Sequence, residues 1–495
     1  MNPREIPKLS KSRFIAGLQC PLRLWHLCYN PELAAEVYLV QQAIFDTGHE
    51  VGRLATRLYP GGVLIEEDHL HHEEAIKSTL AVLKDPSVPA IFEGAFLQDD
   101  VRIRADILER LDDGRWNLIE VKSSTSLKDY YLQDVAAQCY VLKDAGLQIA
   151  AAGVMHLNNQ YIFDGKDIDL ESLFSFFDLT GQVLDLQDEI ALQIGELKKV
   201  LAGAFPPDMV PSRACNSPYG CDFWEYCTAK KPEFWVMQLS GITQKKLDRL
   251  DELEIEDIRD IPNSFPLSKI QERIRDCTVR GAVYAAPQLA PDLMDVQYPV
   301  HFLDFETISP AIPRHAGTRP YQTIPFQWSD HILSENGTIE HREYLCEEDK
   351  DPRQEFAGKL LEVIGKRGTI FVYTSYEKRI IEDLAELLPQ YHAELLAVLD
   401  RFKDLHALVK KHVYYPEFHG SFSLKSVLPA LVPSMGYDEL AIQDGNLASI
   451  EYLRMLDPDT PGEEREKIKE SLLEYCGNDT LGMVKIREEL LKFLS

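Results

Sequence analysis

One cysteine near the start of the chain and three much further along constrain the fold more than any other feature. Cys20 stands by itself, whereas Cys215, Cys221 and Cys227 lie in the run CNSPYGCDFWEYC, in which five residues separate each cysteine from the next. Clustered cysteines in a reducing compartment are read first as metal ligands. If all four thiolates bind one centre, the ends of the first half of the chain must meet and close a domain.

The composition is that of a globular protein with enough residues for two or three domains. The chain has 495 residues, of which 45% are hydrophobic and 27% are charged. No stretch has the roughly 18 apolar residues that a membrane helix needs. The N-terminal run MNPREIPKLSKSRF contains no apolar signal core, so we expect a cytoplasmic protein without a membrane partner.

The net charge of −28 argues against nonspecific wrapping of nucleic acid over a basic surface. It does not exclude a nuclease, because catalytic carboxylates are negative and bound divalent ions reverse the local sign of the charge. We therefore expect narrow basic grooves on an acidic body.

The pattern of helices and strands divides the chain into three blocks of an α/β protein. Residues 1–230 combine helical stretches with the strands IFEGAFLQ, VRIRADILERL and RWNLIEVKSS, which predicts a mixed α/β core. Residues 231–292 are helical and resemble a helix–hairpin–helix module, whose helix N-terminus would bind phosphate; a helical linker is the alternative. Residues 293–495 begin with strands and continue as helices.

A first candidate site lies on the strands of the first block. Asp106 is on one strand, and Glu120 and Lys122 are two residues apart on the next, so the latter two project from the same face. The turn at Asp113-Gly114 would bring the two strands together as a hairpin. Two carboxylates can bind a divalent ion that activates water, and a lysine can orient that water or neutralise developing charge.

Two neighbouring residues extend this site. Glu93, on the strand before, would supply a further carboxylate for the metal. Gln138, on the helix that follows, would contact substrate or a metal-bound water, or else be an ordinary polar helix residue.

On these motifs, residues 1–230 resemble the RecB-type PD-(D/E)XK nucleases that carry an iron–sulfur cluster, such as the CRISPR-adaptation exonucleases and the AddB nuclease domain. The resemblance implies a restriction-endonuclease-like fold with Asp106, Glu120 and Lys122 as the catalytic core, supported by Glu93 and Gln138. It also implies that a [4Fe-4S] cluster is bound by the four cysteines, Cys20, Cys215, Cys221 and Cys227. Zn²⁺ is the alternative for four thiolates.

Two departures from that family stand out. Its cysteine trio more often has a short first gap, whereas both gaps here are five residues long. Its metal-binding histidine falls four residues after a glycine, but Gly48 is followed at that distance by Gly52, and His49 lies elsewhere on the helix. Cys28 is either a substitute ligand or a buried core thiol.

A second candidate site lies in the third block. The run VHFLDFET places Asp304 and Glu306 two apart on an apolar strand, where two charges are costly unless they bind a metal or are otherwise paired. Near the C-terminus, Tyr475 and Asp479 are four apart in LLEYCGNDTLGMVKI and share one helix face.

This block resembles the DnaQ-type (DEDD) 3′–5′ exonucleases of the RNase H-like fold, in their tyrosine variant. The resemblance implies that Asp304, Glu306 and Asp479 bind Mg²⁺ or Mn²⁺ and that Tyr475 positions the attacking water. Both blocks together resemble a little-characterised bacterial family of RecB-like nucleases with a C-terminal DnaQ-like domain.

The second motif of the exonuclease family is incomplete here. Its aspartate position holds Glu377 in the run FVYTSYEKRIIEDL. Asp404 is the other carboxylate that could complete the metal site, with a helix N-cap as its alternative role. Lys425 would meet a phosphate or be a solvated surface residue.

We therefore expect a metal-dependent nuclease with two separate active sites that hydrolyses the phosphodiester bonds of nucleic acid, with DNA as the expected substrate and exonucleolytic cleavage as the expected mode. Repair, spacer processing and phage defence are the candidate pathways, with protein partners in such a complex. The alternative is a nucleic-acid-binding scaffold in which one or both sites are inactive, which the substitution at Glu377 and the missing histidine favour.

Overall fold

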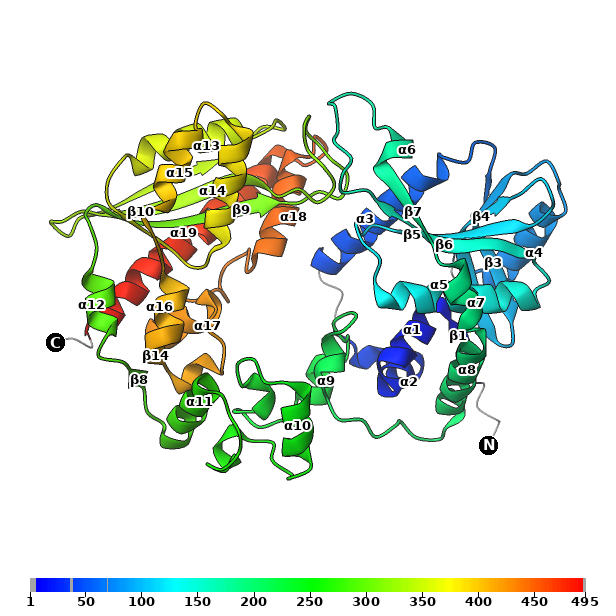
Figure 1. Cartoon of the computed structure of the whole chain (residues 1–495), viewed down its shortest axis with the longest axis horizontal. Helices are drawn as coiled ribbons and strands as arrows, with labels where there is room; N and C mark the ends of the chain where they lie inside the picture. Colours follow the sequence, from blue (N-terminus) through cyan, green and yellow to red (C-terminus); the bar gives the residue numbers. More distant parts are fainter. Residues whose placement is uncertain (1–5, 36–38, 69, 493–495) are drawn as a thin grey trace. The chain divides into compact units, whose positions relative to one another are not determined.

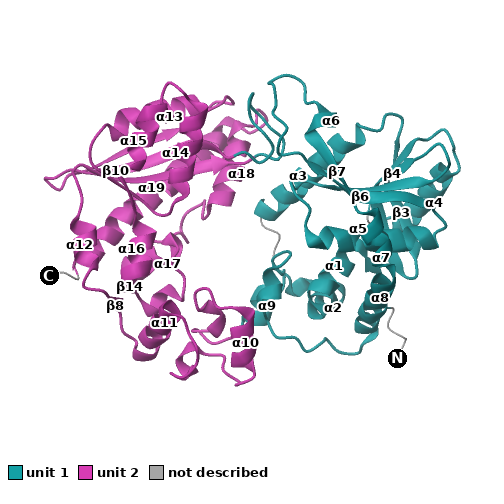
Figure 2. Cartoon of the chain, in the orientation of Figure 1, with its two compact units in different colours: residues 1–230, 310–322 teal, residues 231–309, 323–495 magenta. Residues whose placement is uncertain are grey.

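A computed structural model describes residues 6–35, 39–68 and 70–492 of the chain. The protein has a mixed α/β architecture (Figure 1). It separates into two compact units: unit 1 comprises residues 1–230 and 310–322, and unit 2 comprises residues 231–309 and 323–495 (Figure 2). Residues 231–292 belong to unit 2 in this division. Within the described residues, no helix combines the length and apolar character needed to cross a membrane.

Unit 1 is built on a seven-stranded mixed sheet with the order β2-β3-β4-β5-β6-β7, and β1 pairs with β4. Strands β3, β4 and β5 are antiparallel neighbours, β5 and β6 are parallel, and β7 is antiparallel to β6. The strands are β1 (Leu9–Ser10), β2 (Val63–Leu64), β3 (Ala90–Gln98), β4 (Val101–Arg110), β5 (Trp116–Lys122), β6 (Ile149–Leu157) and β7 (Phe174–Asp178).

Helices cover both faces of this sheet. Val135 of α5 and Ile194 of α8 belong to the core on one face, whereas Val51 of α3 packs with Ile107 and Ile119 on the other. The helices of unit 1 are α1 (Lys11–Gln19), α2 (Pro21–Tyr29), α3 (Leu39–Thr56), α4 (His72–Leu83), α5 (Asp129–Asp144), α6 (Leu170–Leu173), α7 (Thr180–Asp185), α8 (Gln187–Ala202) and α9 (Trp224–Thr228).

A break between α1 and α2 sets the position of the first cysteine. The sequence predicts one helical stretch here, but Cys20 has extended dihedral angles, φ −160° and ψ 119°. The reason is Pro21, because a proline ring disfavours the helical conformation of the residue before it. Cys20 therefore lies at the corner between two helices.

Unit 2 contains a five-stranded sheet with the order β11-β10-β9-β12-β13. The central strand β9 is antiparallel to β10 and parallel to β12, and β10 pairs antiparallel with β11. The strands are β9 (Val300–Ile308), β10 (Ile324–Leu333), β11 (Ile339–Leu345), β12 (Thr369–Val372) and β13 (Phe402–Asp404); a separate ladder joins β8 (Tyr284–Ala285) to β14 (Val413–Tyr414).

The long helix α19 packs on β9 and β10, so it brings residues from the end of the chain to the centre of the sheet. This helix spans Gly462–Lys492. The other helices of unit 2, labelled in Figure 1, are α10 (Gln244–Asp251), α11 (Lys269–Arg280), α12 (Leu289–Met294), α13 (Arg353–Ile364), α14 (Tyr376–Leu387), α15 (His392–Leu399), α16 (Leu405–His412), α17 (Leu424–Leu431) and α18 (Gly445–Leu456).

Candidate functional site

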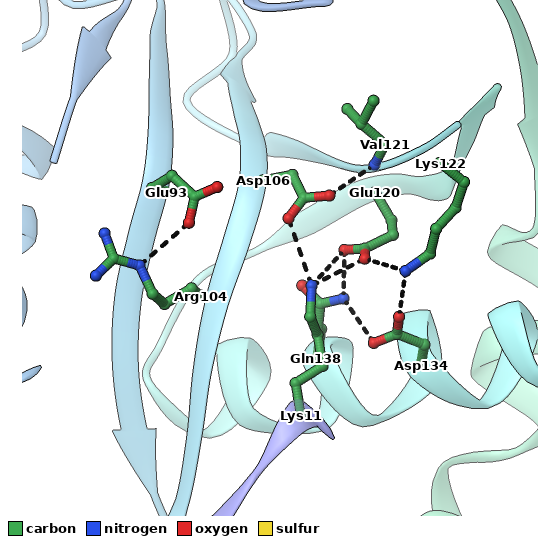
Figure 3. A network of polar contacts seen from close by, with 9 residues as sticks. All are labelled: Lys11, Glu93, Arg104, Asp106, Glu120, Val121, Lys122, Asp134 and Gln138. Atoms are coloured by element: carbon green, nitrogen blue, oxygen red, sulfur yellow. Dashed lines mark hydrogen bonds and ion pairs between the residues drawn. The ribbon is translucent and has the colours of Figure 1, made fainter. Parts of the chain in front are cut away.

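In unit 1, Asp106 and Glu120 face each other where β4 and β5 separate. The ladder between these strands ends at the pair Ile107–Ile119, one residue before the two carboxylates would pair. Instead, the backbone N–H of Val121 donates to Oδ2 of Asp106 at 2.8 Å (Figure 3). Glu120 is 1% exposed and Asp106 is partly exposed, so the pair forms a mostly buried acidic centre.

Two lysines bring their ammonium groups to Glu120. Nζ of Lys122 lies 2.6 Å from Oε1, as two residues on the same face of β5 allow. Nζ of Lys11 lies 2.8 Å and 3.0 Å from the two carboxylate oxygens of Glu120 and 3.4 Å from Oδ1 of Asp106. Lys11 was not predicted, because nothing in its local sequence marks the start of α1 as part of a site.

Helix α5 completes the network with two residues on one face. Gln138 donates through Nε2 to Oε2 of Glu120 at 2.7 Å and to Oδ1 of Asp134 at 3.2 Å. Asp134 in turn accepts from Nζ of Lys122 at 2.8 Å. The sequence analysis included Gln138 but missed Asp134, whose signal is its position four residues before Gln138, one helical turn away.

Glu93 lies beside the same centre but in an unusual backbone conformation. The β3–β4 register continues on both sides of it, from Phe92–Ile107 to Gly94–Ala105, which places Glu93 opposite Asp106. Its φ of 56° is strained for a residue with a side chain. Its carboxylate is half exposed and accepts from Nε of Arg104 at 3.1 Å. His49 lies on α3 with an exposed side chain.

Burial and the neighbouring charges shift the pKa values of Asp106 and Glu120 in opposite directions. Burial and the charge of Glu120 raise the pKa of Asp106 to about 7. Burial also disfavours the ionised form of Glu120, but Lys11 and Lys122 hold its pKa below the usual range. Desolvation works against the charge on Lys122, yet Asp134 and Glu120 raise its pKa. Glu120 is therefore an anion held between two cations at neutral pH.

The four predicted cysteine ligands line one cavity of unit 1. Cys20 lies at the α1–α2 corner, Cys215 in a short 3₁₀ turn (Arg213–Asn216), Cys221 before α9, and Cys227 within it. Burial raises the pKa of the Cys227 thiol to about 11, with the other three sulfurs adding to the effect.

Cys28 behaves differently from these four. It lies on α2 and packs against the hydrophobic core of unit 1. Three further thiols, Cys139, Cys277 and Cys346, are buried.

In unit 2, β9 and α19 bring three potential ligands together. One oxygen each of Asp304 and Glu306 and the sulfur of Cys476 all lie within 4.8 Å of one another. Among the described residues, this is the one group of three such ligand atoms that meets this limit. Sγ of Cys476 is 3.8 Å from Oδ2 of Asp304. Cys476 was missed in the sequence, although it stands three residues before Asp479 and so shares its side of a helix.

Two tyrosines hold Asp479 at this cluster. The hydroxyl of Tyr437 donates to Oδ1 of Asp479. Tyr475, one turn before Asp479 on α19, also makes a side-chain hydrogen bond to it. Tyr437 was not predicted, because it lies in a loop before α18 with no motif around it.

Glu377 also reaches the cluster. It lies in the first turn of α14, is 3% exposed, and its carboxyl group forms a hydrogen bond with Asp304. Its other oxygen, Oε2, has no hydrogen-bond partner among the described residues. Glu377 is the residue that the sequence analysis puts at the aspartate position of the second motif.

Asp404 has a structural role at the end of β13. Its Oδ1 accepts from the N–H of Ala407 at 2.8 Å, so it caps helix α16, which was the alternative reading of its sequence position. Its charge still acts on Glu377. Lys425 is exposed on α17, and its charge acts on Glu306 and Asp479.

The carboxyl groups of the unit 2 cluster hold their protons more tightly than usual. Burial first, and then Glu377, raise the pKa of Asp304 well above its ordinary value. Burial and the charge of Asp304 do the same for Glu306 and Asp479. Burial raises the pKa of Glu377 to about 7. Lys425, the cation whose charge acts on Glu306 and Asp479, is itself exposed, so a bound metal ion would stabilise this group of buried acids.

Comparisons with known proteins add little to this geometry. A family model described as "Domain of unknown function (DUF2779)" matches residues 301–423, which include Asp304, Glu306 and Glu377. No curated protein matches the chain. A solved chain described as "Crystal structure of SSO0001" is similar over 38% of this chain and 77% of its own length, with 13% identity and a TM-score of 0.21.

Proposed function

We propose that this protein is a metal-dependent nuclease with two separate sites, one in each unit, that hydrolyse phosphodiester bonds of DNA. The observation that carries the proposal is the buried acidic cluster of unit 2, in which Asp304, Glu306, Glu377 and Asp479 converge and the cation that acts on them, Lys425, is exposed. Such a set of oxygen ligands suits Mg²⁺ or Mn²⁺.

The unit 2 site would act as a DnaQ-like exonuclease of RNase H-like fold. Asp304, Glu306 and Asp479 would hold divalent ions, which when bound lower the pKa of water and neutralise the charge of the phosphate. Tyr475 lies beside Asp479 and would orient the attacking water, whereas Tyr437 keeps Asp479 in place. Lys425 is exposed and close enough to act electrostatically on the acids, so it would bind a phosphate of the substrate.

The unit 1 site would act as a PD-(D/E)XK nuclease of restriction-endonuclease-like fold. Asp106 and Glu120 would hold the divalent ion, with Glu93 opposite Asp106 as a further carboxylate. Lys122 would stabilise the developing charge, and Asp134 positions its ammonium group through the 2.8 Å contact.

The four thiols of unit 1 would bind a [4Fe-4S] cluster rather than Zn²⁺. In a tetrahedral zinc site with bonds of about 2.3 Å, the sulfur atoms lie about 3.8 Å apart. No three of the four cysteine sulfurs, all of them described residues, lie within 4.8 Å of one another, although all four line one cavity. The wider spacing suits a polynuclear cluster.

End-labelled DNA and RNA, single- and double-stranded, with Mg²⁺ or Mn²⁺ test the two-site proposal. We expect Lys122→Ala and Asp304→Ala to remove different cleavage products and the double variant to remove all of them. Lys143→Ala is the matched control for Lys122→Ala, and Asp459→Ala is the matched control for Asp304→Ala, because both change residues that are exposed. A double variant that cleaves as fast as the parent would refute the proposal.

One observation favours a second candidate, a nucleic-acid-binding role for unit 1 with catalysis confined to unit 2. Lys11 and Lys122 already compensate the charge of Glu120, so this centre is stable without a metal ion. In that case Lys122→Ala would weaken DNA binding and leave the cleavage pattern unchanged.

A further inference from the structure

We propose that Cys476 is a metal ligand in unit 2 and makes the acidic cluster a mixed thiolate–carboxylate site that binds Zn²⁺ more tightly than Mg²⁺. The inference rests on the proposed function to the extent that Asp304 and Glu306 must bind divalent ions. It goes further in naming a sulfur ligand and the class of ion that this ligand selects.

The geometry fits a single ion shared by sulfur and oxygen. With Zn–S of about 2.3 Å and Zn–O of about 2.1 Å, a tetrahedral site separates the two ligand atoms by about 3.6 Å. Sγ of Cys476 and Oδ2 of Asp304 are 3.8 Å apart, and an oxygen of Glu306 lies within 4.8 Å of both residues' ligand atoms. Little movement would be needed to place all three around one ion.

A second observation at the same place points to a cation. Glu377 is 3% exposed, and its Oε2 is buried without a hydrogen-bond partner among the described residues. Its charge acts on Asp304, so the two carboxyl groups lie close together. A divalent ion bound beside Asp304 would supply a partner for this oxygen.

The surroundings of Cys476 offer no other partner of comparable chemistry. Its side chain is fully buried, and its remaining contact is with the backbone carbonyl of Asp304 at 3.8 Å. No ion pair among the described residues connects a lysine or arginine to Asp304, Glu306, Glu377 or Asp479. The other buried thiols of unit 2 are elsewhere: Sγ of Cys346, for example, contacts the carbonyl of Glu348 at 3.4 Å.

Ligand chemistry then determines the choice of ion. Thiolates bind Zn²⁺ and Cd²⁺ strongly, whereas Mg²⁺ prefers a shell of oxygen atoms alone. On binding, the S–H bond of Cys476 breaks, a sulfur–metal bond forms, and the proton passes to the solvent, with no change in oxidation state. Zn²⁺ held in this way would displace the catalytic ion, so low concentrations of Zn²⁺ would inhibit the unit 2 nuclease.

Cd²⁺ provides a direct probe, because Cd²⁺–thiolate bonds absorb in the ultraviolet and Cd²⁺–carboxylate bonds do not. The full chain, purified without oxygen and freed of exchangeable metal, is titrated with Cd²⁺ as the parent, Cys476→Ser and Cys346→Ser. The four cysteines of unit 1 contribute equally to the Cd²⁺ absorbance of all three proteins. Their contribution therefore cancels when the spectrum of a variant is subtracted from that of the parent. We expect Cys476→Ser to lose the absorbance of one thiolate and to bind Zn²⁺ at least tenfold more weakly, and Cys346→Ser to match the parent.

Identical difference spectra for the parent and Cys476→Ser would overturn the inference. Mn²⁺ binding to Asp304→Asn, followed by calorimetry, separates that result from a failure of the proposed function. If Asp304→Asn loses a Mn²⁺ site while Cys476→Ser keeps its full Cd²⁺ absorbance, unit 2 has a metal site formed by carboxylates and Cys476 is not one of its ligands. If neither variant differs from the parent, unit 2 has no metal site. Cys476→Ala, which needs no hydrogen-bond partner, replaces the serine variant if that variant unfolds.

Discussion

The ammonium group of Lys11 lies 2.8 Å from Oε1 of Glu120, although 109 residues separate the two in the chain. The same group is 3.4 Å from Asp106, so it stands between the two carboxylates that would bind a divalent ion. Asp106 and Glu120 raise the pKa of Lys11, against the opposing effect of burial, so Lys11 is charged at any physiological pH. A metal ion must therefore compete with Lys11 for the same oxygen atoms.

Replacing Lys11 with methionine tests this competition. The variant keeps most of the length of the side chain but removes its charge, so we expect Mn²⁺ to bind unit 1 more tightly, on the order of tenfold, or about 1.4 kcal/mol. Calorimetry in an Asp304→Asn background restricts the measurement to unit 1. Lys143→Met, at an exposed position on α5, is the control. Weaker Mn²⁺ binding by Lys11→Met would show that Lys11 helps to assemble the site instead of competing with the ion.

The raised pKa of Glu377 predicts how the free energy of unfolding of the metal-free protein depends on pH. The pKa of Glu377 is raised from 4.5 to about 7, so the folded state binds more protons than the unfolded state between these values. The contribution of Glu377 to the free energy of unfolding should therefore fall as pH rises from about 4.5 to about 7 and level off above. Burial is the main cause, with Asp404 and Asp479 adding to it.

Glu377→Gln removes this titration and keeps the shape of the side chain. At pH 8 without metal, we expect the variant to be more stable than the parent by roughly 2–3 kcal/mol, with no difference below pH 4.5. Denaturant unfolding at several pH values measures this. Mn²⁺ should reverse the order, because the ion favours ionised carboxylates and the variant lacks one. A variant that is less stable than the parent at pH 8 in the absence of metal would contradict the assignment.

The sequence predicted the elements with strong periodic patterns and missed those defined by tertiary contacts. In unit 1, apolar and polar residues alternate in β4, which contains Asp106, whereas β3 and β5, which contain Glu93 and Glu120, are short apolar runs bounded by polar turns. The sequence gives no sign of strand β11, because five of its seven residues are exposed and it has no buried face to recognise. The break at Cys20 was also missed, although Pro21 provides a local signal for it.

The candidate sites show the same division. The motif spacing predicted that Asp304 and Glu306 share one face of a strand and that Asp479, from the far end of the chain, lies near them. In the structure, the charges of Asp304 and Asp479 both act on Glu306. Lys11 and Tyr437 could not be predicted, because their roles depend on where α1 and the loop before α18 come to lie in the folded chain. Residues without a motif are found only when the packing is known.

The cysteine cavity predicts a sharp difference between two thiols eight residues apart. Cys20 lines the cavity with the other three predicted ligands, whereas Cys28 packs into the core of unit 1. We expect anaerobically purified protein to be brown, and Cys20→Ser to lose the visible absorbance and most of the bound iron, while Cys28→Ser keeps both. Absorbance and iron and zinc analysis of the three proteins provide the measurement. A colourless parent that contains zinc would favour the zinc alternative.

Two tyrosines near Asp479 predict different kinetic defects. Tyr437 donates its hydroxyl hydrogen to Asp479 and is 7% exposed, so its role is to orient a metal ligand. Tyr475 lies one turn before Asp479 on α19, where its hydroxyl would also reach the attacking water. We expect Tyr437→Phe to weaken Mn²⁺ binding to unit 2 by about 10–100-fold, the usual effect of removing a partner of a metal ligand, and saturating Mn²⁺ to restore kcat. Tyr475→Phe should instead lower kcat at saturating Mn²⁺, with a smaller change in metal affinity.

Metal titrations of single-turnover cleavage, in a Lys122→Ala background that leaves unit 2 as the active site, distinguish these two kinetic defects. If saturating Mn²⁺ restored Tyr475→Phe as fully as Tyr437→Phe, both tyrosines would serve only to hold Asp479, and the water would have to be oriented by another group.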